Sequence, residues 1–435
     1  MRVLVVSTAA LGVKHVVHDV LSALVGDDDG SPADEYHYLT RPSMPVPDGV
    51  TVSTVGSAAM TDRLRDLEPA YLGYAILGFW VRAYHRLARE HAEYDAVWLH
   101  NPRLLPLLPE AAAEHCLVTY HNHLRGAKAD YHDGLSRLYY RFFGAIENRG
   151  IRTKPGLRYT GVARDVVGEL RVAGLPPERV RYVGNGVDVT RFAPERVADL
   201  DRERYPMLAP ARIERTVSEP DGGGKGVYPP DGAVDGRDAD STADGDYSPT
   251  SPGREPIRLL SLGSLTEQKR PLSLLRFYEA LRERNGVPCS LVLAGDGPRR
   301  EAVERFVAEH DLPDVHLLGF VEEQQKPAIY AAADYFVLPS RYEGEPLALY
   351  EALASGLPAL VSDLPVHRFV DEADCGRVLD FDHPTTAASS AATYLEQPNT
   401  RDSMNARTYA TEQLSWETRA TEYRDELRFV GGLPC

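Results

Sequence analysis

Short apolar runs alternate with longer helix-like segments along this 435-residue chain, and this alternation restricts the folds that the chain can adopt. In the first part of the chain, strand-like runs occupy 3–6, 35–39, 96–99 and 116–120, and helix-like segments occupy 11–24 and 64–91. Apolar runs of this length are typical of strands buried on both faces of a parallel sheet. Strands that alternate with helices therefore predict an α/β domain with a mostly parallel sheet.

The alternation stops over residues 207–256 and starts again at Ile257. The intervening segment combines glycines, prolines and repeated aspartates with little apolar surface, so we expect a disordered linker whose deletion (221–251) leaves the fold intact. Its Asp238-Ala-Asp240 and Asp244-Gly-Asp246 resemble a metal-binding pair, but an acidic linker explains them better. The predicted domains are 1–206 and 257–412, followed by a terminal helix at 413–435.

The charge composition indicates both the partners and the source of the chain. A formal net charge of −16, from 64 acidic and 48 basic residues, argues against nucleic acid as a partner. Lysine occurs only at positions 14, 128, 154, 225, 269 and 326. An acidic, lysine-poor surface suits a cytosol with molar salt, so we favour a halophilic archaeal source over the compositional bias of a GC-rich genome. A halophilic source predicts a melting temperature that rises with potassium chloride.

Cysteine usage and hydropathy indicate a cytoplasmic location. The four cysteines are far apart and lack metal-ligand spacing, which argues for a reducing compartment and against a zinc site. The opening apolar run is too short for a signal peptide, and no run reaches membrane-spanning length. The apolar stripe Tyr71–Val81 is best explained as core, and the alternative is a peripheral contact with the inner face of a membrane that carries a lipid-linked acceptor.

One stretch, from Ser340 to Pro358, reads as a strand end, a tight loop, a helix and a stop. Ser340 and Glu343 have the spacing of a helix cap, and Gly356 ends the helix. A helix amino terminus at the carboxyl end of a strand favours a phosphate group. Two carboxylates beside it, Glu343 and Glu351, would repel the phosphate but suit sugar hydroxyls on either side of it. Two solvated glutamates are the simpler alternative.

This stretch resembles the signature of the retaining glycosyltransferases of family four, in which a Glu, seven residues and a second Glu hold a nucleotide-sugar. The resemblance covers the chain apart from the linker and is strongest over 257–365. It implies the GT-B fold, an α/β architecture of two Rossmann-like domains with parallel sheets that face each other across a cleft. It also implies that the C-terminal helix crosses back to the first domain.

The resemblance assigns roles to residues of the second domain. Glu351 should bind ribose hydroxyls, Glu343 should bind hydroxyls of the donor sugar, and Lys269 with Arg270 should neutralise the diphosphate. The arginine that usually follows Gly263 is Ser264 here, so one cation of the family pattern is missing. The remaining residues implied on the donor side are Gly263, Phe320 beside the base, and the loop Gly344, Glu345, Pro346 and Leu347.

The resemblance also assigns residues of the first domain. His100 and His121 each follow a predicted strand and should lie at the carboxyl edge of the sheet, where open α/β folds bind ligands. The family places a histidine at His121, next to the transferred sugar. Asn185 belongs to an Asn-Gly-Val-Asp motif that faces the cleft, and Gly12 is the one glycine of the family's first turn that is present here.

The expected function is metal-independent, retaining transfer of a hexose from a nucleotide-diphosphate-sugar to a glycan or lipid-linked acceptor, as in the assembly of cell-surface glycans or lipid-linked oligosaccharides. Glu343, His121 and Lys269 are the expected catalytic residues. No cofactor besides the donor substrate and no metal ligand is expected, because no Asp-X-Asp lies at a strand end. Two alternatives stay open: a non-catalytic nucleotide-sugar-binding protein, and an epimerase or hydrolase on the same fold.

Overall fold

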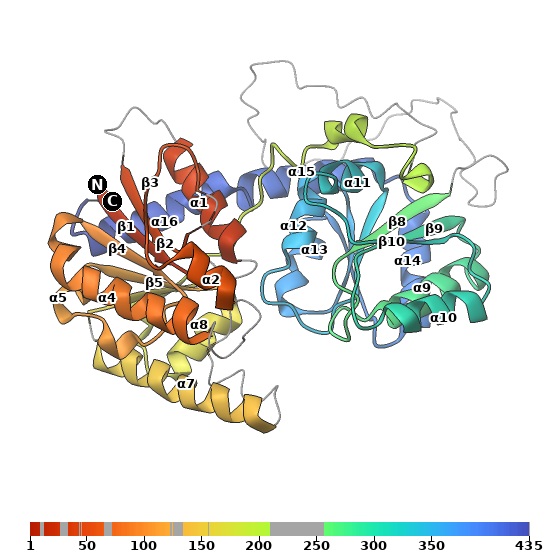
Figure 1. Cartoon of the computed structure of the whole chain (residues 1–435). Helices are drawn as coiled ribbons and strands as arrows, with labels where there is room; N and C mark the ends of the chain where they lie inside the picture. Colours follow the sequence, from red (N-terminus) through yellow and green to blue (C-terminus); the bar gives the residue numbers. More distant parts are fainter. Residues whose placement is uncertain are drawn as a thin grey trace, which may run out of the picture.

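The computed structural model describes residues 1–8, 13–26, 34–42, 44, 46–64, 72–121, 124, 134–154, 156–208 and 256–434. Two α/β domains lie side by side, and both chain termini lie on the first of them (Figure 1). Gly12 and the linker residues 209–255 fall outside the described residues. Their predicted roles therefore stay predictions.

The N-terminal domain is built around a seven-stranded, fully parallel sheet in the order β3-β2-β1-β4-β5-β6-β7. Its strands are β1 Arg2–Ser7, β2 Glu35–Thr40, β3 Thr51–Thr54, β4 Ala96–His100, β5 Cys116–Tyr120, β6 Arg158–Gly161 and β7 Val180–Tyr182. Its main helices are α1 Val13–Gly26, α2 Ala58–Leu64, α4 Gly78–Glu90, α5 Glu110–Ala113, α7 Gly134–Thr153 and α8 Arg164–Val172. The predicted parallel α/β domain is confirmed.

The C-terminal domain repeats the design with six parallel strands in the order β10-β9-β8-β11-β12-β13. The strands are β8 Ile257–Leu262, β9 Cys289–Ala294, β10 Val315–Gly319, β11 Tyr335–Leu338, β12 Ala359–Ser362 and β13 Gly376–Leu379. The helices are α9 Pro271–Glu283, α10 Arg300–Glu309, α11 Lys326–Ala332, α12 Leu347–Ala354, α13 Phe369–Glu372, α14 Pro384–Leu395 and α15 Thr400–Gln413, and α16 Trp416–Val430 follows them along the chain. Two parallel sheets, each with helices on both faces, are the architecture that the resemblance implies.

Each sheet reverses its strand order once, and the reversal fixes where a ligand can bind. In the N-terminal domain, β1 pairs with β2 on one side and with β4 on the other. In the C-terminal domain, β8 pairs in the same way with β9 and with β11. In open α/β sheets ligands bind beyond the carboxyl ends of the strands at such a reversal. The loops after β4, β8 and β11 are therefore the places to look for chemistry.

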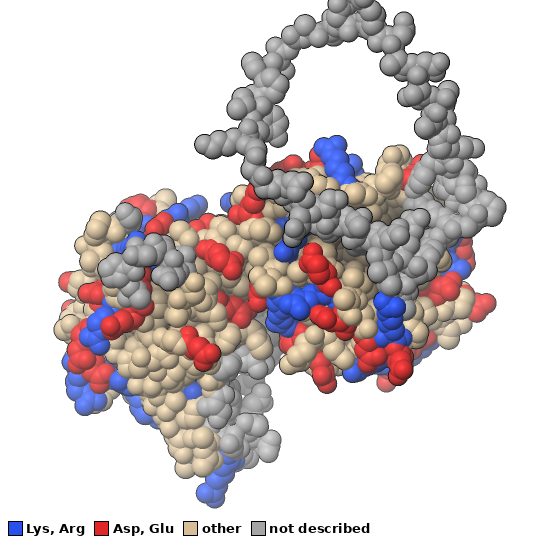
Figure 2. All heavy atoms as spheres, turned by 90° about the horizontal axis from the view of Figure 1, so that it is seen from above, with Lys and Arg blue, Asp and Glu red and all other residues tan. Residues whose placement is uncertain are grey.

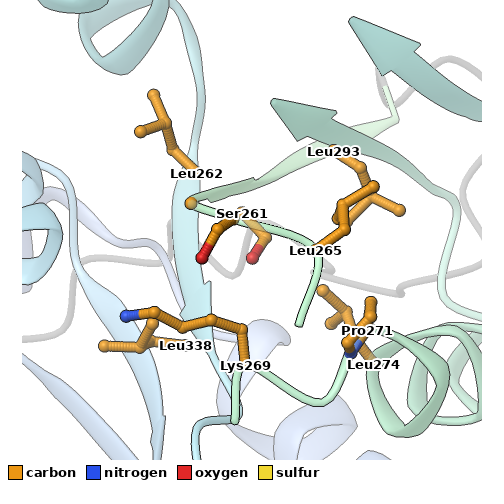
Figure 3. A pocket seen from close by; sticks show the side chains of 10 residues that line it. Ser261, Leu262, Leu265, Lys269, Pro271, Leu274, Leu293 and Leu338 are labelled. Atoms are coloured by element: carbon orange, nitrogen blue, oxygen red, sulfur yellow. The ribbon is translucent and has the colours of Figure 1, made fainter. Parts of the chain in front are cut away.

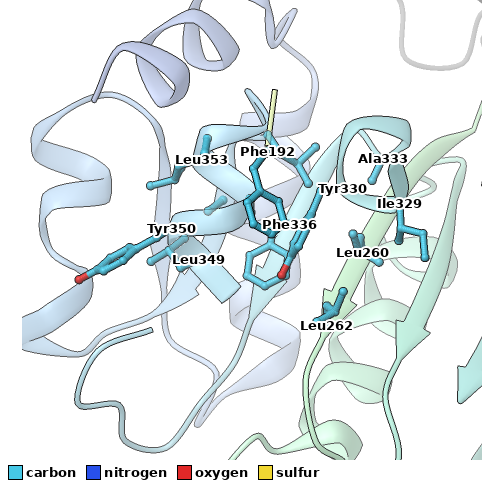
Figure 4. Packing of buried hydrophobic residues seen from close by; sticks show 14 of the residues in the cluster. Phe192, Leu260, Leu262, Ile329, Tyr330, Ala333, Phe336, Leu349, Tyr350 and Leu353 are labelled. Atoms are coloured by element: carbon cyan, nitrogen blue, oxygen red, sulfur yellow. The ribbon is translucent and has the colours of Figure 1, made fainter. Parts of the chain in front are cut away.

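Residues that precede the predicted boundary at 206 pack against the C-terminal domain. Phe192, Tyr205 and Leu208 are buried in the hydrophobic cluster of the C-terminal domain. Figure 4 shows Phe192 among the side chains of that cluster, next to Tyr330 and Phe336. This packing joins Phe192, Tyr205 and Leu208 with the second domain, and the boundary at 206 stays a prediction.

Helix α16 returns to the N-terminal domain, as predicted, and covers one face of its sheet (Figure 1). The return begins where Val187 N–H donates to the Leu414 carbonyl at 2.8 Å. A Cβ on Gly186 would lie 2.6 Å from the Trp416 ring, so only glycine fits where the two crossing segments meet. The Asn-Gly of the sequence motif thus has a packing reason.

The apolar stripe before residue 81 belongs largely to the core. Phe79 and Trp80 are fully buried, and Ala75 and Ile76 are nearly so. The core interpretation is confirmed for these four side chains, whereas Val81 is 48% exposed. None of the helices in the described ranges is long and apolar enough to cross a bilayer.

Candidate functional site

Lys269 and Glu343 meet at the reversal point of the second sheet. Lys269 lies in the loop after β8 and Glu343 in the loop after β11, and these two strands are neighbours. The Lys269 Nζ lies 2.5 Å from Glu343 Oε1. The Glu343 side chain is only 7% exposed, so its charge is held out of water beside one cation. A buried carboxylate needs such a partner.

Backbone contacts hold these two loops together. Arg341 N–H donates to the Gln268 carbonyl at 2.8 Å, and the Gln268 side-chain amide donates to the Tyr342 carbonyl at 2.9 Å. Lys269 also borders a small hollow whose walls come from the ends of β8, β9 and β11 (Figure 3). The pair is therefore placed by the sheet and by neighbouring backbone, and its geometry is set before any ligand arrives.

The local structure of the 340–358 stretch differs from the predicted cap. Ser340 Oγ donates to Glu343 Oε1 at 2.6 Å, but both residues lie in the loop, and α12 starts at Leu347 with Pro346 as its uncapped first flanking residue. The helix end is as predicted. Gly356 has φ +69°, and Leu357 N–H donates to the Ala352 carbonyl, which is a Schellman ending.

The loop offers fewer backbone donors than predicted. Pro346 has no N–H, and Leu347 N–H donates to the Glu345 carbonyl at 3.0 Å. Gly344 and Glu345 are the loop residues whose amides can still meet a phosphate. A Cβ on Gly344 would lie 3.7 Å from Ala163 of the N-terminal domain, so this loop lies at the contact between the domains.

Glu351, on α12, contacts a tyrosine and a lysine of α11. Tyr330 Oη donates to Glu351 Oε2 at 2.9 Å, and Lys326 Nζ lies 3.7 Å from Oε1. Burial raises the pKa of Glu351. A carboxylate with one oxygen 3.7 Å from a cation and the other accepting from a phenol can accept from a ligand hydroxyl as well. Phe320, predicted beside the base, is 75% exposed at the end of β10, where its ring is open to stacking.

Glu345 links the two domains. Its carboxylate accepts from Tyr182 Oη of the first domain at 2.9 Å and from Tyr350 Oη of the second at 2.8 Å. Burial raises the pKa of Glu345 to about 7, although the two hydrogen bonds and Arg419 oppose this shift. The backbone of Asn185 also donates to this carboxylate, so Asn185 joins the domain contact. Donor binding by Glu345 and Asn185 stays a prediction.

Arg270 is engaged away from the Lys269–Glu343 pair. Its guanidinium donates to the Phe381 carbonyl at 2.9 Å and to Asp382 Oδ1 at 2.6 Å. Diphosphate binding by Arg270 stays a prediction, and it would require these contacts to break. The structure therefore brings only one of the two predicted cations, Lys269, to Glu343. Gly263 lies in the wall of the hollow next to Lys269.

His100 and His121 form a pair at the carboxyl edge of the first sheet. His100 Nδ1 lies 2.8 Å from His121 Nε2, and the rings are stacked with centroids 5.1 Å apart. Burial lowers the pKa of His121 to about 3 and lowers the pKa of His100 as well. Both imidazoles are thus uncharged at neutral pH. His121 Nδ1 is buried without a partner within the described residues, and it can meet a ligand group.

This histidine pair predicts a loss of stability on mild acidification. The folded chain keeps His121 uncharged, whereas the unfolded chain protonates it near pH 6.5, so stability falls as pH drops below that value. Between pH 6.5 and 5, His121 alone should account for about 2 kcal/mol. Urea unfolding of wild type and His121→Asn at both pH values measures the difference. An equal pH dependence in the two proteins would contradict the assignment.

Sequence reasoning missed His367, Lys326 and the tyrosine partners of Glu345 and Glu351. His367 is fully buried, and its Nδ1 lies 2.9 Å from the Ser362 carbonyl, so this nitrogen carries the proton and Nε2 is left without a partner among the described residues. Its pKa is lowered mainly by burial, and the charges of Glu343 and Lys269 act on it. No local pattern around His367 marks it, because its closeness to Glu343 depends on the order of the strands.

Two family models match the two halves of the chain. Glycosyltransferase Family 4 matches residues 12–191, and Glycosyl transferases group 1 matches residues 249–411. The chain belongs to a GT-B glycosyltransferase family. The boundary between the matched regions falls in the linker, in agreement with the two sheets.

Curated relatives match parts of this glycosyltransferase. The O-antigen chain mannosyltransferase B of Escherichia coli is 30% identical over 169 residues, 38% of this chain and 43% of that protein. The GDP-mannose-dependent alpha-(1-6)-phosphatidylinositol dimannoside mannosyltransferase of Mycobacterium tuberculosis (strain ATCC 25177 / H37Ra) is 32% identical over 165 residues, 38% of this chain and 42% of that protein. The match thus spans less than half the length of each of these relatives.

Solved structures match over nearly the whole glycosyltransferase chain. Anabaena Alr3699/HepE in complex with UDP and glucose has a TM-score of 0.59 at 13% identity, over 99% of this chain and 100% of that chain. WaaG, a glycosyltransferase involved in lipopolysaccharide biosynthesis, has a TM-score of 0.59 at 16% identity, over 98% of this chain and 99% of that chain. At these identities the likeness concerns the fold.

Proposed function

We propose that the chain transfers a hexose from a nucleotide-diphosphate-sugar to an acceptor hydroxyl and retains the anomeric configuration of the donor. The observation that carries the proposal is the Lys269–Glu343 pair at the reversal point of the second sheet, directly before α12. A cation and a helix amino terminus suit a diphosphate, and the adjacent carboxylate suits sugar hydroxyls. A neighbouring structure of the same fold holds UDP and glucose, which supports this class of donor.

In the proposed reaction the bond from the anomeric carbon to the diphosphate breaks while the acceptor oxygen bonds to the same face of that carbon. The acceptor hydroxyl gives its proton to the departing diphosphate oxygen. Lys269 and the amides of Gly344 and Glu345 stabilise the negative charge that develops on this oxygen. Glu343 accepts from a sugar hydroxyl when the diphosphate draws Lys269 toward itself. The uncharged His121 hydrogen-bonds the sugar through Nδ1.

We propose a glycan or a lipid-linked sugar as acceptor, presented by the N-terminal domain. The support is that relatives are named for O-antigen chains and for a phosphatidylinositol dimannoside. The donor test measures melting temperature against a panel of nucleotide-sugars and their diphosphates, since a ligand that binds only the folded state raises it. A melting temperature that rises with one class of nucleotide-sugar identifies the donor. Release of the nucleoside diphosphate only when an acceptor is present supports transfer. Free sugar or epimerised donor without acceptor favours the hydrolase or epimerase alternative.

Glu351→Gln is expected to weaken binding of the nucleoside diphosphate. A ribose hydroxyl would lose a charged acceptor, which is worth roughly 1.5–3 kcal/mol, or about ten- to a hundredfold in Kd. Isothermal titration calorimetry of the diphosphate checks this, with Glu396→Gln, at an exposed position after α14, as the matched control. An unchanged Kd in Glu351→Gln would remove this residue from the ribose site.

A further inference from the structure

Helix α7 presents an exposed face that differs from the rest of this acidic chain. Its exposed positions with described side chains are Arg137, Leu138, Arg141, Phe142, Ala145, Arg149, Arg152 and Thr153. These positions recur at intervals of three and four, so they form one continuous stripe along the helix. The stripe contains four arginines and no carboxylate. The one acidic residue of the helix, Glu147, is 4% exposed and faces the core.

The apolar members of this stripe lie on the part of α7 that projects. The end of the helix is fixed to the domain by Ile151, which is 2% exposed, and by Gly150 against Leu105. The amino-terminal turns extend past the rest of the N-terminal domain (Figure 1). Leu138 and Phe142, both on these turns, are 64% and 61% exposed.

Phe142 belongs to a series of aromatic ring contacts along α7. Tyr139 and Phe143 have ring centroids 4.7 Å apart, and Phe142 lies edge-on to Phe143 at 5.3 Å. Aromatic and aliphatic side chains flanked by arginines on one helix face are the composition of helices that lie in the interface of an anionic bilayer. A net charge of −16 repels an anionic surface, and red carboxylates are spread over both domains in Figure 2. Contact with such a surface therefore needs a local face without carboxylates.

We propose that the exposed face of α7 docks on an anionic lipid surface, with Leu138 and Phe142 inserted among the acyl chains and the arginines at the headgroups. A second copy of the chain is a poorer occupant, because a two-fold contact through this stripe would bring arginines against arginines. This inference rests on the proposed function: a docked α7 would bring the N-terminal domain, which presents the acceptor, to a membrane that carries a lipid-linked acceptor. Along the chain, α7 begins at Gly134, 13 residues after His121.

The proposal is tested by flotation of the full chain with lipid vesicles, with no donor or acceptor present. Vesicles of phosphatidylcholine alone are compared with vesicles that also contain phosphatidylglycerol, at the lowest potassium chloride concentration at which the chain stays folded, because higher salt screens the attraction to anionic lipid. The chain should float with the anionic vesicles only, and Arg141→Gln/Phe142→Ser should reduce the bound fraction at least tenfold. The matched control is Arg401→Gln/Met404→Ser on α15, which removes an exposed arginine and an exposed apolar side chain elsewhere and should bind like wild type.

Melting temperatures of both double variants establish that they are folded. Equal flotation of wild type and Arg141→Gln/Phe142→Ser would overturn the proposal, as would no preference for anionic vesicles. A wild-type dimer that this α7 variant converts to a monomer, measured by light scattering, would assign the face to a second copy instead. Lys269→Met should float like wild type, so a failure of membrane docking and a failure of sugar transfer are told apart.

Discussion

Lys269→Met is expected to lower kcat for sugar transfer about 10²–10³-fold, because the departing diphosphate loses the cation that lies at the reversal point of the second sheet. The same change leaves the Glu343 carboxylate, 7% exposed, without its charged partner. It should therefore also reduce the free energy of unfolding by about 1–3 kcal/mol. Steady-state kinetics and urea unfolding measure the two effects separately.

A second substitution separates catalysis from stability. Lys269→Met/Glu343→Gln removes both charges, so it should recover most of the lost stability while transfer stays low. Arg299→Met is the matched control: it breaks an exposed ion pair with Glu267 in the same domain and should leave transfer unchanged, with a stability change within about 0.5 kcal/mol. Recovery of transfer in the double variant would show that Lys269 serves only to neutralise Glu343.

Glu345→Gln is expected to flatten the dependence of stability on pH between about 4.5 and 7. Burial raises the pKa of this carboxyl to about 7, so the folded chain holds a proton that the unfolded chain releases near pH 4.5. Its contribution is fully present below pH 4.5 and is lost as pH rises through 7, at a cost on the order of 3 kcal/mol.

This dependence has the opposite sign to that of the buried histidines, so the difference between wild type and Glu345→Gln is the informative quantity. Glutamine can keep a hydrogen bond to Tyr182 and to Tyr350, which preserves the domain contact. Urea unfolding at pH 5 and pH 8 should show the variant gaining stability relative to wild type at the higher pH. The same difference at both pH values would contradict a proton on Glu345.

The sequence predicted those features that depend on local patterns. The strand, loop and helix around Glu343 follow from an apolar run and from Gly356. Both signals can be recognised from the local sequence, without knowing which other segments pack nearby. The position of Lys269 after β8 follows in the same way. The contact of Lys269 with Glu343 requires β8 and β11 to be adjacent. The local sequence does not show this adjacency, and the family resemblance implied it only through the expected fold.

The features that sequence reasoning did not reach depend on long-range packing. The Phe381 carbonyl and Asp382, more than a hundred residues later, hold the guanidinium of Arg270, whose place at the diphosphate stays a prediction. Phe192 and Leu208 fill the core of the second domain, and no change of composition marks this packing in the sequence. Ser340 and Glu343 have the spacing of a cap, yet Pro346 delays the helix, so their hydrogen bond closes the loop instead.

The most direct test of the proposed transfer is proton NMR of the product formed in EDTA, with the coupling constant of the new anomeric proton compared with that of the donor. Transfer that persists in EDTA and keeps the donor configuration is the predicted result. It follows if Lys269 and the amides before α12 hold the diphosphate on one face of the sugar while the acceptor attacks from that face. An inverted anomeric centre, or activity lost in EDTA and restored by manganese, would contradict it.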